Sequence, residues 1–137
     1  MPFYVKVKGS FPGKHYWPGA PERFKELGVL HEHVFGFVVE IEEARPREIE
    51  FLEVAQLITH RLTQHLQCHP YLSCEEIARN LFRWLAEGWA VPARRVMYTE
   101  IDEDGGCGAT YRPEPEVDKL VRTILALDPT LLSKGGD

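Results

Sequence analysis

Hydrophobic and polar side chains alternate in two stretches near the start of the chain, residues 3–11 and 31–41. Successive side chains of a β-strand point to opposite faces, so this period of two predicts two strands that are each buried on one face. The segment between them, PGKHYWPGAPERF, is rich in proline and glycine and is expected to be a long loop. The inward-facing positions are Phe3, Val5, Val7 and Phe11 in the first strand, and Phe35, Phe37, Val39 and Ile41 in the second. We therefore expect a hairpin-like pair.

The pattern changes to a helical period after Glu50. Apolar residues then recur at spacings of three and four as far as Leu66, and Pro70 blocks a continuation. A second helix is predicted to begin at Ser73, which forms a capping box with Glu76, and to stop near Gly88.

Two further strands are expected over 95–101 and 107–112, joined by the turn sequence DEDGG. A last amphipathic helix over 117–125 follows two prolines, and the tail SKGGD is expected to be flexible. The predicted order is ββααββα in an α+β fold. We assign residues 1–112 to the main unit and 113–137 to a helix and tail of the same single domain.

The composition fits one domain with a hydrophobic core: 137 residues, of which 44% are hydrophobic and 27% charged. No apolar run approaches the roughly 20 residues of a membrane span, and the N-terminus lacks the layout of a signal peptide, so we expect a cytoplasmic protein. The net charge is −5 and the basic residues are dispersed, which argues against nucleic-acid partners. Three cysteines without CxxC spacing are expected to be free thiols.

Two histidines stand at the start of the second strand and, by its period, face inward. Imidazole is a common metal ligand, and His31 and His33 on one strand would supply half of a tetrahedral zinc shell. Inward-facing histidines can also be ordinary core residues with hydrogen-bond partners. His15, in the expected loop, is the natural third ligand, and the more distant His60, His65 and His69 remain alternatives.

Several motifs occur in an order that resembles the family of 6-pyruvoyl-tetrahydropterin synthase and 6-carboxytetrahydropterin synthase. They are the N-terminal strand with His15, then LHEH, EIEF, LSCEEIARNLFRWL, VMYTEI and CGATYR. The resemblance implies the T-fold, an antiparallel four-stranded sheet with two helices on one face, which assembles into a barrel and usually a hexamer of two trimers. It also implies a zinc-dependent lyase acting on 7,8-dihydroneopterin triphosphate, a pterin precursor.

Carried over residue by residue, the resemblance assigns zinc to His15, His31 and His33. It assigns the anchoring of the pterin ring to Glu100, whose carboxylate would accept two parallel hydrogen bonds from the guanidine-like edge. Glu75 is a second candidate for substrate binding, although a carboxylate in the first turn of a helix can also serve only the helix dipole.

The sequence departs from the family at the proton-transfer residues. Leu27 occupies the place of the catalytic cysteine, and the neighbouring Glu26 is a possible substitute. The family's Asp-His pair falls on Thr59-His60 or on Cys68-His69, depending on the direction of counting, so both His60 and His69 remain candidates and neither has the aspartate.

Two functions from different classes follow. One is a zinc-dependent carbon–oxygen or carbon–carbon lyase on a pterin or another purine-derived substrate. The other is a catalytically silent relative that binds such a ligand or serves only in assembly. If the histidines are merely core residues, the chain is an α+β domain without an assigned site.

Overall fold

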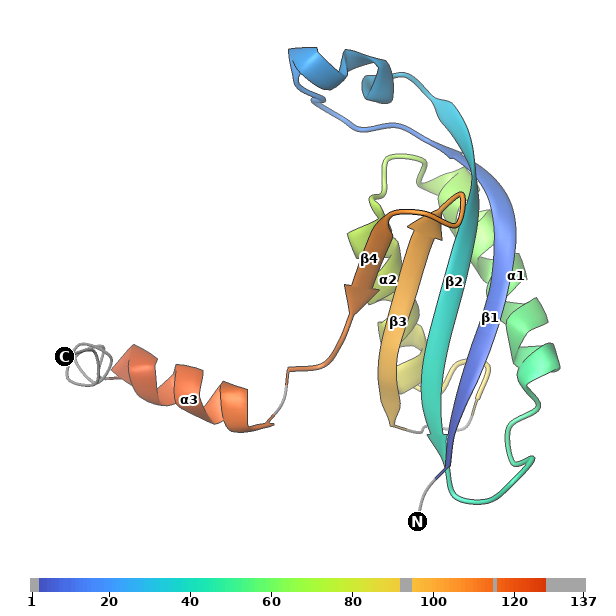
Figure 1. Ribbon diagram of the computed structural model, residues 1–137, viewed down its shortest axis with the longest axis vertical. Helices are drawn as coiled ribbons and strands as arrows, with labels where there is room; N and C mark the ends of the chain where they lie inside the picture. Colours follow the sequence, from blue (N-terminus) through green and yellow to red (C-terminus); the bar gives the residue numbers. More distant parts are fainter. Residues whose placement is uncertain (1–2, 92–94, 115, 128–137) are drawn as a thin grey trace.

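The computed structural model describes residues 3–91, 95–114 and 116–127. Four antiparallel strands form one sheet in the order β1-β2-β3-β4, as Figure 1 shows. The strands are β1 (Phe3–His15), β2 (His31–Glu43), β3 (Val96–Glu103) and β4 (Gly108–Tyr111). The helices are the short 3-10 helix η1 (Glu22–Gly28), α1 (Phe51–Cys68), α2 (Cys74–Ala86) and α3 (Glu116–Leu127). The ββααββα order predicted from the hydrophobic pattern is confirmed.

Strand β1 is longer than its alternating pattern indicated. It continues through Pro12 to His15 and pairs with β2 without a break, ending with His15 opposite His31. The expectation that His15 lies in a loop was therefore wrong. A proline interrupts an interior strand because it has no N–H, but β1 is an edge strand, where a missing N–H can face away from the neighbouring strand.

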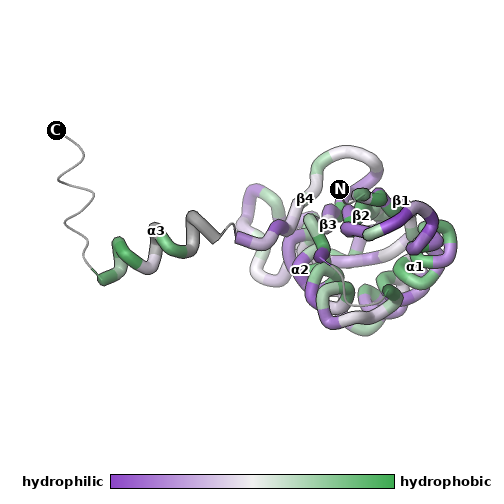
Figure 2. The backbone as a smooth tube through the Cα atoms, turned by 90° about the horizontal axis from the view of Figure 1, so that it is seen from below, coloured by the Kyte–Doolittle hydropathy of each residue, from purple (hydrophilic) through white to green (hydrophobic). Residues whose placement is uncertain are grey.

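Helices α1 and α2 cover one face of the sheet and leave the other face open (Figures 1 and 2). The covered face carries the alternating apolar residues of β1 and β2, as the sequence predicted. Among the described residues, twenty buried hydrophobic side chains form one core. From the sheet, its largest fully buried side chains are Phe11, Phe35, Phe37, Ile41 and Ile101; from the helices they are Ile58, Leu62, Leu66, Ile77, Leu81 and Leu85.

The N-terminus of α2 is fixed by the predicted capping box. The Ser73 hydroxyl accepts from the backbone N–H of Glu76 at 3.2 Å, and the Glu76 carboxylate accepts from the backbone N–H of Ser73 at 3.2 Å. Two of the four N–H groups that a helix start leaves unpaired are thus satisfied. This cap sets where the first turn of α2 meets the end of the sheet.

The β3–β4 hairpin turns through Asp104 and Gly105, which both have positive φ angles, of 54° and 71°. Two central residues in the left-handed region characterise the type I′ turn, which matches the twist of the flanking strands. The N–H of Gly106 closes the turn by donating to the carbonyl of Glu103 at 2.9 Å. The predicted turn is confirmed, and it places Glu103 at the last position of β3.

Helix α3 confirms the predicted C-terminal helix and lies to one side of the sheet in both views (Figures 1 and 2). The assignment of residues 113–137 to the same domain stays a prediction, and the tail SKGGD lies outside the described residues. No helix in the described part of the chain is long and apolar enough to cross a membrane.

Candidate metal centre

The three predicted metal histidines meet at one end of the sheet. His15 closes β1 and His31 opens β2 directly opposite, while His33 follows two residues later on the same face. One ligand nitrogen from each ring lies within 4.8 Å of the other two. The ring of Phe35 packs edge-on against His15 at 5.0 Å and against His33 at 5.7 Å between centroids, so the cluster rests on the hydrophobic core.

Each of the three imidazoles has an oxygen atom facing its Nδ1. The carbonyl of Val29 lies 2.8 Å from Nδ1 of His31, Asp104 Oδ2 lies 2.7 Å from Nδ1 of His33, and the carbonyl of Leu72 lies 3.4 Å from Nδ1 of His15. These oxygens only accept hydrogen bonds, so a neutral ring with its hydrogen on Nδ1 satisfies each contact and keeps the Nε2 lone pair for a metal. Oxygen partners of this kind orient the histidine ligands of metal sites. The donor set fits a zinc ion, which prefers neutral imidazole nitrogen.

Asp104 is a contributor that the sequence analysis did not single out. One carboxylate oxygen contacts His33, and the other accepts from the backbone N–H of Val34 at 2.8 Å. Both hydrogen bonds lower the pKa of Asp104 below its ordinary value, and the one from Val34 has the larger effect. Its place in the turn sequence was visible, but the contact with His33, 71 residues earlier, depends on the pairing of β3 with β2.

Glu103 also reaches the histidine cluster. Its Oε1 lies 3.2 Å from Nε2 of His15 and its Oε2 lies 3.4 Å from Nε2 of His33. The alternation of β3, in which Thr99 and Ile101 are fully buried, also turns Glu103 toward the helices. The alternation of buried and partly exposed positions in β3 was therefore the feature of the sequence from which the inward position of Glu103 could have been predicted.

Burial has opposite effects on two groups beside this carboxylate. It lowers the pKa of His15, mainly because a charged imidazolium loses hydration there. It raises the pKa of Cys74 to about 12, and the negative charge of Glu103 adds to the rise. The Cys74 thiol is therefore protonated at neutral pH, and it donates to Glu103 Oε1 at 3.6 Å.

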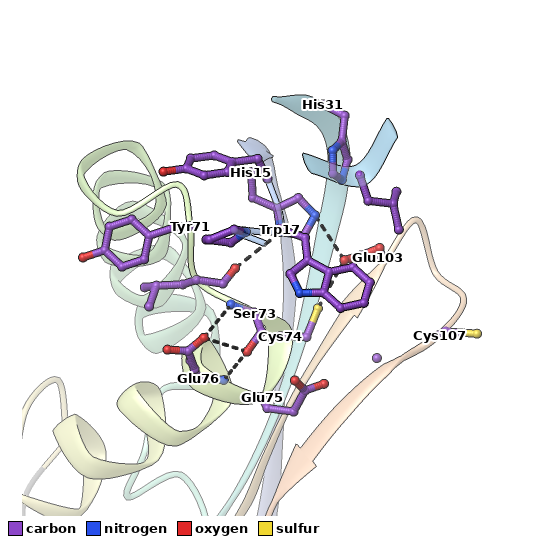
Figure 3. Close-up of a pocket in the computed structure, with 15 residues that line it drawn as sticks. His15, Trp17, His31, Tyr71, Ser73, Cys74, Glu75, Glu76, Glu103 and Cys107 are labelled. Carbon is purple, nitrogen blue, oxygen red and sulfur yellow. Dashed lines mark hydrogen bonds and ion pairs between the residues drawn. The ribbon is translucent and has the colours of Figure 1, made fainter. Parts of the chain in front are cut away.

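A pocket of about 740 Å³ opens beside the cluster, between the first turn of α2 and the segments that flank the histidine strands (Figure 3). His15, His31 and Glu103 form part of its wall, and the ring of His33, which is not part of the lining, packs edge-on against His15 at 5.2 Å between centroids. The other lining residues are Tyr16, Trp17, Pro18, Leu27, Tyr71, Leu72, Ser73, Cys74, Glu75, Glu76, Cys107 and Gly108. Aromatic and acidic side chains thus share one cavity with the potential metal ligands.

Two of the remaining predicted site residues lie at or near this pocket. Glu75 lines it and is exposed. His69 does not line it, but its Nδ1 lies 3.0 Å from the hydroxyl of Tyr71, which does. The backbone also links this region to the cluster, because the N–H of Tyr16 donates to the carbonyl of Pro70 at 2.9 Å.

Three other predicted residues lie elsewhere in the described chain. Glu26 is exposed in η1, next to the lining residue Leu27 but not in the lining itself. His60 is exposed on α1. Glu100 is half-buried on the sheet face opposite the helices, since its neighbours Thr99 and Ile101 face the core. The structure thus gathers His15, His31, His33 and Glu75 but not Glu26, His60 or Glu100.

Comparison with known proteins identifies the fold. Neither a protein-family model nor a curated protein matches the sequence of this chain. A solved structure of 6-pyruvoyl tetrahydropterin synthase from Caenorhabditis elegans superposes with a TM-score of 0.60, at 13% sequence identity, over 83% of this chain and 97% of that one. With its four-stranded antiparallel sheet and two covering helices, the chain has the T-fold architecture expected from its motifs.

Proposed function

We propose that this chain is a zinc-dependent T-fold protein that acts on a pterin or a related purine-derived substrate. The observation that carries the proposal is the histidine cluster, in which each Nδ1 faces an oxygen acceptor and Nε2 is the nitrogen that remains to bind a metal. A histidine that only packs in the core needs one hydrogen-bond partner. Packing alone does not explain why three histidines place their potential metal-ligand nitrogens within 4.8 Å of one another. The similarity in fold to a pterin synthase supports the substrate class.

His15, His31 and His33 would hold the ion. When bound there, zinc would supply Lewis-acid chemistry that polarises a carbonyl or acidifies a hydroxyl of the substrate. The aromatic rings of Tyr16 and Trp17 line the same pocket and offer flat surfaces for a bicyclic ligand.

A carboxylate is needed to accept hydrogen bonds from the guanidine-like edge of a pterin. Glu75 is proposed for this role because it lines the pocket and is exposed there. Glu100 remains the candidate that the resemblance selects. Since it faces away from the helices, a role for it requires the open sheet face to border a binding site.

Proton transfer is proposed for His69, which would act through the Tyr71 hydroxyl that it contacts at 3.0 Å. Glu26 would need a movement of η1 to bring its carboxylate into the pocket beside Leu27. His60 has no such connection to the pocket in the described structure, which makes it the least favoured of the three.

Metal analysis of the purified protein tests the proposed centre. We expect about one zinc per chain, and a loss of zinc in His31→Ala and in His33→Ala. His60→Ala, which removes an exposed histidine from α1, is the matched control and should keep its zinc. A metal-free wild type, or full retention of zinc in both strand variants, would show that the site is not a metal centre.

Incubation of the zinc-loaded protein with 7,8-dihydroneopterin triphosphate, followed by mass spectrometry, tests the activity. A new pterin product supports the lyase. Saturable pterin binding without turnover supports the silent relative, a reading favoured by Leu27 in the place of the family's cysteine. Glu75→Gln should weaken binding by on the order of 2 to 4 kcal/mol, about 30-fold to 1000-fold, because its amide would turn a donor toward the ligand's own donors. Glu100→Gln should have this effect instead if Glu100 is the anchor.

A further inference from the structure

We propose that Glu103 is a fourth protein ligand of the metal centre, so that the resting site is closed by a carboxylate that an incoming ligand must displace. The inference rests on the proposed zinc site and goes beyond it, because it gives the site a built-in competitor for substrate. None of the three histidines needs to change its role.

Two distances around Glu103, one to His15 and one to His33, are close to the spacing of neighbouring ligands in a metal shell. Tetrahedral zinc with nitrogen and oxygen ligands at 2.0–2.2 Å places adjacent ligand atoms about 3.3 Å apart. Oε1 of Glu103 lies 3.2 Å from Nε2 of His15 and Oε2 lies 3.4 Å from Nε2 of His33, so the carboxylate faces each ring with a different oxygen. Both contacts are made by the nitrogen that the Nδ1 partners leave free for metal.

These contacts also need a positive charge. The Glu103 carboxylate presents only lone pairs, and Nε2 of His15 and of His33 presents a lone pair whenever the ring hydrogen is on Nδ1. Two acceptors held this close repel one another, so either a proton on Nε2, which forms an ion pair with the carboxylate, or a metal ion shared by both must lie between them. When the three histidines hold a metal ion, the second arrangement applies.

The position of Glu103 suits a ligand that can leave. It is the last residue of β3, next to the turn, and its side chain is 33% exposed while that of His15 is 10% exposed. It lines the pocket, so a substrate oxygen can approach from the same side (Figure 3). The Cys74 thiol, which donates to Oε1, gives the carboxylate a second partner and acts as a positioning residue.

Cobalt substitution tests the inference, because the visible spectrum of Co²⁺ reports its ligands independently of turnover. We would titrate the metal-free wild type, Glu103→Gln and Glu103→Ala with Co²⁺, and then add azide as an anionic probe. We expect both variants to bind Co²⁺ about tenfold or more weakly than the wild type and to have altered spectra. Azide should change the spectrum of Glu103→Ala at concentrations that leave the wild type unaffected.

Asp102→Asn is the matched control, since Asp102 precedes Glu103 on the same strand, lies on the opposite face and accepts from the N–H of Gly105, and it should keep the affinity and spectrum of the wild type. Equal Co²⁺ affinity, spectrum and azide response in the wild type and both Glu103 variants would overturn the inference while leaving the metal centre intact. Failure of the wild type to bind Co²⁺ would overturn the proposed function as well. Thermal unfolding of the metal-free proteins verifies that the variants fold.

Discussion

At the scale of single residues, the centre is organised by the partners of its histidines more than by the histidines themselves. Val29, Leu72 and Asp104 each place an oxygen atom at an Nδ1 and thereby favour the tautomer in which Nε2 keeps its lone pair for a metal. Two of these partners are backbone carbonyls, which no side-chain substitution removes directly. Asp104 is the exception, and its carboxylate is open to mutation.

Asp104→Asn should weaken zinc binding by about tenfold or more. The asparagine side chain has no negative charge to strengthen His33 as a metal ligand, and it has one oxygen where Asp104 uses two, one for His33 and one for the N–H of Val34. Asparagine is one of the few residues that tolerate the positive φ of this position, so the turn should be retained. Competition with a chromophoric zinc chelator measures the affinity.

Asp102→Asn provides the control in the same hairpin. The Asp102 carboxylate accepts from the N–H of Gly105 at 3.0 Å and is not part of the histidine cluster. Its zinc affinity should equal that of the wild type. If Asp104→Asn also binds zinc with unchanged affinity, the carboxylate does not tune His33.

The histidines were predictable from the sequence because one period of two places His31 and His33 on the face that carries Phe35. Their contacts with Glu103 and Asp104 were not, because these contacts depend on the pairing of β3 with β2, which brings together residues about 70 positions apart. The resemblance directed attention to Glu100, whereas the alternation of β3 points Glu103, three residues later, at the cluster.

At the scale of elements, helices α1 and α2 meet in a cluster of aromatic and basic side chains away from the proposed centre. The ring of His65 on α1 packs edge-on against Trp84 of α2 at 4.8 Å between centroids. The Asn80 amide donates to Nε2 of His65 at 3.1 Å, which requires that nitrogen to be unprotonated. On its own helix, His65 faces His69 and Arg61, whose positive charges oppose a further proton.

These surroundings lower the pKa of His65, with burial as the largest cause and the charges of His69 and Arg61 following. At a pH just below 6.5, the ordinary pKa of histidine, His65 is protonated in the unfolded chain more often than in the folded one. The free energy of unfolding therefore decreases as the pH falls through 6.5 toward the lower pKa of the folded state. His65→Gln, which keeps an acceptor for Asn80, should lose less thermal stability than the wild type between pH 7.5 and pH 5.5. Unfolding followed by circular dichroism at both values measures the difference.

His60→Gln is the matched variant, because it removes an exposed histidine from the same helix. It should retain the acid sensitivity of the wild type. An identical loss of stability in the wild type and His65→Gln would show that His65 does not couple the packing of α1 and α2 to pH.

The elements were largely predictable because each carries its own local signal: alternation in the strands, a period of three to four in the helices, and the capping box at Ser73. The extent of β1 was not, because Pro12 reads as a loop residue until the strand is known to lie at an edge. That difference moves His15 from a loop to a position directly opposite His31.

At the scale of the whole molecule, the sheet is incomplete in the single chain. Among the described residues, β1 and β4 each pair with one neighbour only, so both leave an open edge. The face opposite the helices is also uncovered and carries exposed apolar side chains such as Tyr4 and Val34. Proteins normally cover or close such edges, since an unpaired strand is a template for association.

A contact between two different edges, β1 of one copy and β4 of the next, is head-to-tail and closes into a ring when the rotation permits. We therefore predict a trimer or a hexamer, the assembly that the resemblance implies. Light scattering coupled to size-exclusion chromatography at micromolar concentration gives the mass. A stable monomer of 15.7 kDa would contradict the prediction.

The edge itself can be tested with a second proline in β1. Pro12 has no N–H, so it fits a position whose N–H would point away from β2. Lys8 lies four residues earlier in the same pairing with β2, which has no bulge between them, so the N–H of Lys8 also points away from β2. Lys8→Pro should therefore leave the β1–β2 pairing in place but remove an outward donor and add a ring at the contact edge, which reduces the assembly toward single chains. Lys8→Ala removes the same side chain and keeps the N–H, and it should assemble like the wild type. A folded Lys8→Pro variant with the mass of the wild type would show that the ring does not close through this part of β1.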